Sequence, residues 1–169
     1  EGGIPDIVTL GKPMGNGHPL AGVVAGTDLV DEFGEWGMYF NTFGGNPVSC
    51  AVGMAVLDVL EEEQLLANAV QVGNLVADGL RELQSKHDLV GDVRHKGLFF
   101  ALELVEDRSA KSPATDAAKR LVNEMCEGGV LISRVGRFDN ILKLRPPMPF
   151  SRDNAELLLS TLNDCLMSL

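Results

Sequence analysis

Residues 5–24 are the most informative part of this chain and read Pro5-Asp6-Ile7-Val8-Thr9-Leu10-Gly11-Lys12-Pro13-Met14-Gly15-Asn16-Gly17-His18-Pro19-Leu20-Ala21-Gly22-Val23-Val24. The apolar run from Ile7 to Leu10 predicts a short buried strand that stops at Gly11. Lys12 follows at once, on a turn rich in Gly and Pro. The sequence therefore places one long amine at the carboxyl end of a strand, where open α/β sheets form their ligand crevices.

Lys12 is suited to covalent chemistry at that place. Gly15 and Gly17 would let a bound group come close to the backbone. A lysine forms a Schiff base with an aldehyde cofactor when a neutral fraction of its amine is available. The alternative interpretation is a solvated loop lysine, because lysine is usually exposed. A phosphate-binding P-loop is excluded, because Lys12 is followed by Pro13 where that motif has Ser or Thr.

The composition excludes several classes of partner. Of the 169 residues, 45% are apolar and 22% charged, which is typical of a globular protein. The net charge is −10, with no block of Lys or Arg, so neither nucleic acid nor an anionic membrane surface is an expected partner. No apolar run approaches the roughly 18 residues of a membrane span, and the first residues show no signal-peptide pattern.

The cysteines and histidines predict neither disulfides nor a metal site. Cys50, Cys126 and Cys165 are odd in number and far apart, which favours a reducing compartment, and we expect the cytoplasm. The histidines lack the spacing of metal ligands, so no metal is expected. The chain has no initial Met and enters a strand almost at once, which suggests a piece of a longer protein.

Gly and Pro divide the chain into elements. The Phe-Gly and Trp-Gly pairs between Thr27 and Tyr39 predict a partly packed loop, after which Asn46 and Pro47 predict the capped start of a helix. The elements expected beyond it are a helix over 65–86 that links two lobes, a strand–turn–strand over 90–105, a helix beginning at Ser112-Pro113 and closed by Gly128-Gly129, strands over 130–133 and 141–145, and a last helix capped by Ser151.

The sequence contains two further candidate anion-binding sites. Residues 42–46 (Thr-Phe-Gly-Gly-Asn) precede a helix N-terminus, so a hydroxyl and free backbone N–H groups can face a phosphate; a simple capped turn is the alternative. Lys143 and Arg145 alternate with apolar residues and share one strand face, where two cations could hold a carboxylate or phosphate. The alternative is a strand face that carries charges only to protect a sheet edge.

Three strings together identify a resemblance to the class III (ornithine/ω-amino-acid type) aminotransferases, which are pyridoxal-phosphate enzymes of fold type I. They are residues 5–21, residues 41–51 (Asn-Thr-Phe-Gly-Gly-Asn-Pro-Val-Ser-Cys-Ala) and residues 90–99 (Val-Gly-Asp-Val-Arg-His-Lys-Gly-Leu-Phe). The resemblance covers essentially the whole chain. It implies an α/β fold, namely the C-terminal part of such an enzyme: the end of the large cofactor-binding domain over 1–65, a linking helix over 66–86 and a small α+β domain over 87–169.

The resemblance also implies roles for particular residues. Lys12 is the lysine that forms the Schiff base with pyridoxal 5′-phosphate. Thr42, with its neighbour Phe43, matches the segment from which the family's other subunit holds the cofactor phosphate, so a homodimer with a shared active site is expected. The implied activity is transfer of an amino group from an amino acid or amine to a keto acid or aldehyde.

Two departures from the family pattern keep alternatives open. The phosphate loop, the ring-stacking aromatic residue and the aspartate that pairs with the pyridine nitrogen are absent, so the isolated chain is expected to be inactive, and a non-catalytic or dimerisation fragment stays possible. Lys143 stands where many members carry the arginine that binds the substrate carboxylate, and Arg145 follows it. Lys143, together with residues 16–19 (Asn-Gly-His-Pro) and 47–53 (Pro-Val-Ser-Cys-Ala-Val-Gly), is similar to the subgroup of ethanolamine-phosphate phospho-lyases and alanine–glyoxylate aminotransferase 2-like enzymes. Phosphate elimination from an amino-phosphate is therefore the alternative reaction.

Overall fold

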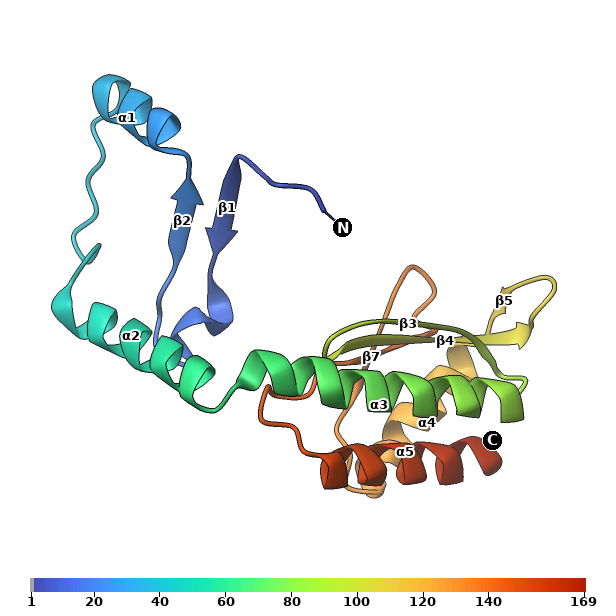
Figure 1. The fold of residues 1–169 in the computed structure, drawn as a ribbon. Coiled ribbons are helices and arrows are strands. Elements are labelled where there is room, and N and C mark those ends of the chain that lie inside the picture. The colour runs from blue at the N-terminus through green and yellow to red at the C-terminus, as the bar shows by residue number, and fades with distance from the viewer. Residues whose placement is uncertain (1) are drawn as a thin grey trace. The chain divides into compact units, whose positions relative to one another are not determined.

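The chain divides into two compact units, Glu1–Glu63 and Gln64–Leu169, called here the N-terminal unit and the C-terminal unit. The structure is a computed structural model that describes residues 2–169 (Figure 1). None of the described helices is long and apolar enough to cross a membrane.

The N-terminal unit consists of a β-ribbon and two helices (Figure 1). The strands β1 (Ile7–Leu10) and β2 (Gly22–Ala25) pair antiparallel, and the short 3-10 helix η1 (Lys12–Gly15) lies in the connection between them. The helices α1 (Thr27–Trp36) and α2 (Pro47–Glu62) follow.

This unit has almost no interior of its own. Gly15 is its only buried residue among residues 2–63. A strand forms at Ile7–Leu10 as expected, but the expectation that it is buried was wrong, since Ile7 is 56% exposed. The physical reason is that β1 has a single neighbouring strand, and a two-stranded ribbon has no second layer in this unit to cover its apolar side chains.

The loop expected between Thr27 and Tyr39 is also wrong, because residues 27–36 form the helix α1. Leu29, Val30 and Phe33 recur at helical spacing, and this periodicity outweighs the single Gly34. Gly37 ends the helix, where its N–H bonds back to the carbonyl of Phe33. Glycine pairs alone were therefore a poor signal for a loop here.

The start of α2 is confirmed in detail. Asn46 is the N-cap residue, and its side-chain Oδ1 accepts a hydrogen bond from the Ser49 N–H at 2.9 Å. Pro47 occupies the first helical turn, where its missing N–H leaves no bond unmade.

The C-terminal unit packs helices against one face of an antiparallel sheet (Figure 1). The strand order is β3-β4-β7-β6, and the short β5 pairs with β4. In chain order the elements are α3 (Leu65–Lys86), β3 (Val90–Lys96), β4 (Phe99–Asp107), β5 (Ser112–Pro113), α4 (Thr115–Glu127), β6 (Ser133–Val135), β7 (Ile141–Leu144) and α5 (Arg152–Met167).

The core of this unit follows the period-2 alternation of apolar residues in its strands and their 3.6-residue spacing in its helices. Alternate residues of the central strands point inward, and the stripes of α3, α4 and α5 cover them. The fully buried members include Val76, Leu80, Phe100, Leu102, Leu104, Leu121, Met125, Leu142 and Leu162. The last helix begins with a reciprocal capping box between Ser151 and Asn154, which confirms the expected cap.

Two expected boundaries in this unit were wrong. Ser112-Pro113 do not start a helix but form the short strand β5, in which Pro113 pairs with Val105 of β4. A proline is tolerated there because β5 is an edge strand, where the N–H that proline lacks would face away from the sheet. The strand expected from Val130 begins only at Ser133. The reason is that the Val130 N–H bonds to the carbonyl of Met125 and so completes the end of α4.

Candidate functional site

Lys12 lies directly after β1, at the start of η1, and its side chain is exposed. Its backbone has φ 39°, a left-handed conformation that is uncommon for a residue with a long side chain. The turn holds this conformation through hydrogen bonds from the Met14 N–H to the Gly11 carbonyl at 3.2 Å and from the Asn16 N–H to the Pro13 carbonyl at 2.9 Å. Residues held in such conformations cluster at functional sites.

The segment 42–46 forms a structured turn before α2, not an open row of free donors. The Asn41 Oδ1 accepts hydrogen bonds from the N–H groups of Phe43 at 3.2 Å and Gly44 at 3.0 Å. The expectation of free backbone N–H groups was therefore wrong for these two. The hydroxyl of Thr42 is exposed and has no hydrogen-bond partner among the described residues, so it is a donor that this turn can offer to a ligand.

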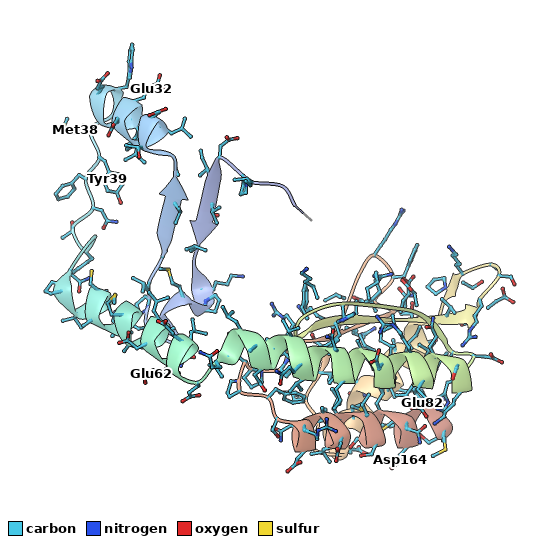
Figure 2. All side chains as sticks on the ribbon, viewed as in Figure 1. Glu32, Met38, Tyr39, Glu62, Glu82 and Asp164 are labelled. Carbon is cyan, nitrogen blue, oxygen red and sulfur yellow. The ribbon has the colours of Figure 1, made fainter. Side chains whose placement is uncertain are left out.

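Tyr39 also belongs to this turn. Its hydroxyl oxygen accepts a hydrogen bond from the Asn41 Nδ2 at 3.0 Å, and Figure 2 shows the ring beside the chain between α1 and α2. Asn41 thus uses its oxygen and its nitrogen at once, which fixes the backbone on both sides of Thr42.

A hydrogen-bond chain joins the Lys12 turn to this second turn. The Nε2 of His18 lies 2.8 Å from the Oγ of Ser49, and the same Oγ accepts from the Nδ2 of Asn46 at 2.8 Å. The sequence predicted the cap at Asn46 but not its connection to His18. No short-range signal could have shown a contact between positions 18 and 49, because both residues read separately as ordinary polar turn residues.

Lys143 and Arg145 lie in the C-terminal unit. Lys143 is the third residue of β7, and Arg145 follows directly after the strand ends at Leu144. Leu142 and Leu144 are buried in the core, so Lys143 points to the opposite face, where it is half-buried beside Ala101 of β4. The predicted alternation of faces is confirmed for these residues of the strand. The guanidinium of Arg145 lies over the ring of Phe99, 5.9 Å from its centre.

The sheet face opposite the core, called here the open sheet face, carries some charges that form ion pairs and some that form none within the described part of the chain. Arg94 contacts both Asp92 and Glu103, and the hydrogen bond with Glu103 is the main cause that raises the pKa of its guanidinium. Among the described residues, no carboxylate lies within 4.0 Å of Lys143 or Arg145. The neighbouring acidic groups are thus taken by Arg94, and two cations stay available for an anion.

The family follows from a match along almost the entire sequence. The family model for class III aminotransferases matches residues 1–166. The chain belongs to the class III aminotransferase family. The mixed helix–sheet architecture of this class III chain corresponds to the C-terminal part of the fold type I architecture, as the sequence predicted.

Individual relatives of this class III chain carry two kinds of name. An alanine–glyoxylate aminotransferase 2-like protein of Drosophila melanogaster is 46% identical over 165 residues, which are 96% of this chain and 33% of that protein. An ethanolamine-phosphate phospho-lyase homolog of Caenorhabditis elegans is 41% identical, over 91% of this chain and 33% of that protein. The chain therefore spans about a third of the length of these curated relatives.

A solved structure gives the same picture. A phospholyase from Arthrobacter, in complex with phosphoethanolamine, superposes with a TM-score of 0.96 at 48% identity, covering 99% of this chain and 40% of the other. Both the transaminase and the phospho-lyase branches of the predicted subgroup are thus represented among the matches.

The residues present fit pyridoxal phosphate, the cofactor of class III aminotransferases. An aldehyde needs an accessible amine, and Lys12 offers one at a strained turn. A phosphate needs a hydrogen-bond donor without a partner, and the Thr42 hydroxyl is one. The structure brings these two groups into one unit and places Lys143 and Arg145 in the other.

Proposed function

We propose that this chain is the C-terminal portion of a pyridoxal-phosphate-dependent aminotransferase that moves an amino group from an amino acid or amine to a keto acid or aldehyde. The single observation that carries the proposal is Lys12, held at φ 39° directly after a strand, in a chain that the class III family model matches over residues 1–166. Further support comes from the aminotransferase 2-like relative in Drosophila.

Each candidate residue has a task in this proposal. Lys12 holds the cofactor aldehyde covalently and, once released, moves a proton at the substrate carbon. Bound pyridoxal phosphate supplies the electron-withdrawing ring that makes this carbon acidic. Thr42 donates a hydrogen bond to the cofactor phosphate of the partner subunit, with Phe43 beside it, and Lys143 and Arg145 bind the anionic group of the substrate.

Trapping of the lysine tests this proposal. The full-length protein is incubated with pyridoxal phosphate, reduced with borohydride and digested, and the modified peptide is mapped. We expect the label on Lys12 and its loss in Lys12→Arg, with Lys96→Arg as the control that keeps it. A label scattered over the lysines, or none, would refute the assignment and favour a non-catalytic or dimerisation role.

Phosphate elimination from an amino-phosphate is the second candidate reaction, and a specific observation favours it. Lys143 has no ion-pair partner among the described residues and stands at the position where many family aminotransferases carry a carboxylate-binding arginine. The phospholyase in complex with phosphoethanolamine is 48% identical to this chain. Release of inorganic phosphate from phosphoethanolamine without any keto acid would decide for elimination. A strict need for a keto acid, with no phosphate released, would decide for transamination.

We also propose that the working protein is a homodimer in the cytoplasm. Sharing of the cofactor phosphate through Thr42 requires a second subunit. The free cysteines Cys50, Cys126 and Cys165 favour a reducing compartment. Light scattering of the full-length protein and cell fractionation test these two statements separately.

A further inference from the structure

A short polar chain links the two turns of the N-terminal unit that carry Lys12 and Thr42. His18 Nε2 lies 2.8 Å from Ser49 Oγ, which accepts from Asn46 Nδ2 at 2.8 Å. Asn46 Nδ2 also donates to the carbonyl of Phe43 at 2.8 Å. The chain therefore runs from the Lys12 turn, through the first turn of α2, to the residue next to Thr42.

The turn between Lys12 and His18 is compact enough to transmit a displacement. Gly15 is buried, and a Cβ at this position would lie 3.1 Å from the Cβ of Leu20 and 3.3 Å from that of His18. The His18 N–H bonds to the Gly15 carbonyl at 3.0 Å. Because no loose segment separates the two residues, movement of the imidazole is expected to move the backbone that carries Lys12.

We propose that His18 is a positioning residue which, through Ser49 and Asn46, fixes the Lys12 amine relative to the turn that carries Thr42. This inference rests on the proposed function, in which Lys12 serves the cofactor of its own subunit and Thr42 that of the partner subunit, so the link ties together the residues that one chain gives to the two sites. The benefit is geometric: a misplacement of about 1 Å in a reacting group can cost roughly a hundredfold in rate.

The chemistry of the link makes it persistent. The Ser49 hydroxyl has one proton and two acceptor sites. It can donate to a neutral His18 or accept from its N–H, and in both cases one acceptor site stays free for Asn46 Nδ2. The contact therefore survives either protonation state of the imidazole, and the test has to remove the side chain instead of changing the pH.

The test uses the full-length protein with pyridoxal phosphate and four variants: His18→Leu, His18→Gln, Ser49→Ala and the double variant His18→Leu/Ser49→Ala. The first measurement is the rate at which borohydride fixes the cofactor on Lys12 at a set pH and cofactor concentration. The second is kcat and KM. Thermal unfolding of the cofactor-free protein accompanies both. His87→Leu is the matched control, because it breaks another histidine contact, 3.1 Å to Asn163, in the C-terminal unit.

We expect His18→Leu and Ser49→Ala each to lower the trapping rate and kcat by about tenfold or more, with KM changing less. The double variant should be no worse than the poorer single variant, because both remove the same link. The amide of His18→Gln can reach Ser49 and should restore most of the rate. His87→Leu should trap at the wild-type rate.

Three results would overturn the proposal: unchanged trapping in His18→Leu, losses that add in the double variant, or losses that merely follow a lower unfolding temperature in all variants, His87→Leu included. Failure of the proposed function looks different, since wild-type protein would then show no trapping on Lys12 at all. If the wild-type protein traps the cofactor on Lys12 and His18→Leu does so at the same rate, the proposed function is supported and only the role of His18 is refuted.

Discussion

Gly73 of α3 lies directly against Gly97 in the turn between β3 and β4. A Cβ at Gly73 would come 2.4 Å from the carbonyl oxygen of Gly97 and 2.7 Å from its carbonyl carbon. Backbone atoms cannot rotate aside as a side chain can, and Gly97 itself has φ 53°, in the region that favours glycine. The hairpin β3–β4 is therefore seated on α3 at a point where both surfaces need a residue without a side chain.

Gly73→Ala should lower the free energy of unfolding by about 2 kcal/mol, because forcing extra atoms into a packed contact costs roughly 1–3 kcal/mol. The loss should appear although alanine favours a helix over glycine by about 1 kcal/mol. Urea unfolding of the full-length protein measures it. The matched control is Gly79→Ala on the same helix.

Gly79→Ala should stay within about 1 kcal/mol of wild type, because any strain is offset by the gain in helix propensity. Its Cβ would lie 2.4 and 2.9 Å from the two methyl groups of Leu159 and 3.2 Å from its Cγ, and these are atoms of a flexible side chain that can change its rotamer. Equal losses in the two variants would contradict the special role of the backbone contact at Gly97.

Arg108 closes the C-terminal end of α3, and its loss should destabilise the C-terminal unit. Its guanidinium donates hydrogen bonds to the carbonyls of Gln84, His87 and Asp88. We expect Arg108→Ala to cost about 1–2 kcal/mol, since charged donors stabilise helix carbonyls but this side chain is partly exposed. Arg120→Ala, which removes only a 3.8 Å helix ion pair, is the control. The same cost for both would show that the three carbonyl contacts contribute nothing special.

Asn68 holds the loop that follows Arg145. Its Nδ2 donates to the carbonyls of Met148 at 2.8 Å and Phe150 at 3.1 Å. Asn68→Ala leaves both carbonyls without this donor, so it should cost about 1–3 kcal/mol and speed hydrogen exchange at the Phe150 amide, which bonds to the Pro147 carbonyl. Asn74→Ala, an exposed position on the same helix, should change neither. Unchanged exchange at Phe150 in Asn68→Ala would refute the role.

Cys165 should resist alkylation in the folded protein, while the exposed Cys126 reacts. Burial, and then the carboxylates of Glu124 and Asp164, raise the pKa of the Cys165 thiol. A raised pKa means that the unfolded state loses its proton first, so this thiol leaves stability unchanged below the usual thiol pKa of about 8.5 and lowers it above. Iodoacetamide labelling followed by peptide mapping between pH 7 and 9 checks the order; equal rates for both thiols would contradict it.

The sequence predicted most helices because their signals are local. The stripes of α3 and α5, the cap at Asn46 and the capping box at Ser151 all depend on residues within one or two turns. It missed α1, where glycine pairs were given more weight than the spacing of Leu29, Val30 and Phe33. It misplaced the starts of α4 and β6, because a strand pairing at Pro113 and a helix ending at Val130 depend on neighbours that only the fold supplies.

By itself the sequence determined the family, the cofactor lysine candidate at Lys12 and the anion-binding candidates Thr42, Lys143 and Arg145, because motifs and alternating faces are written in neighbouring residues. Three contacts became visible only in the folded chain: Asn41 accepts from the N–H groups of Phe43 and Gly44, Arg94 pairs with Asp92 and Glu103 on the open sheet face, and His18 contacts Ser49. These are contacts between side chains whose distance is set by how the chain folds back on itself, and no local pattern encodes such a distance.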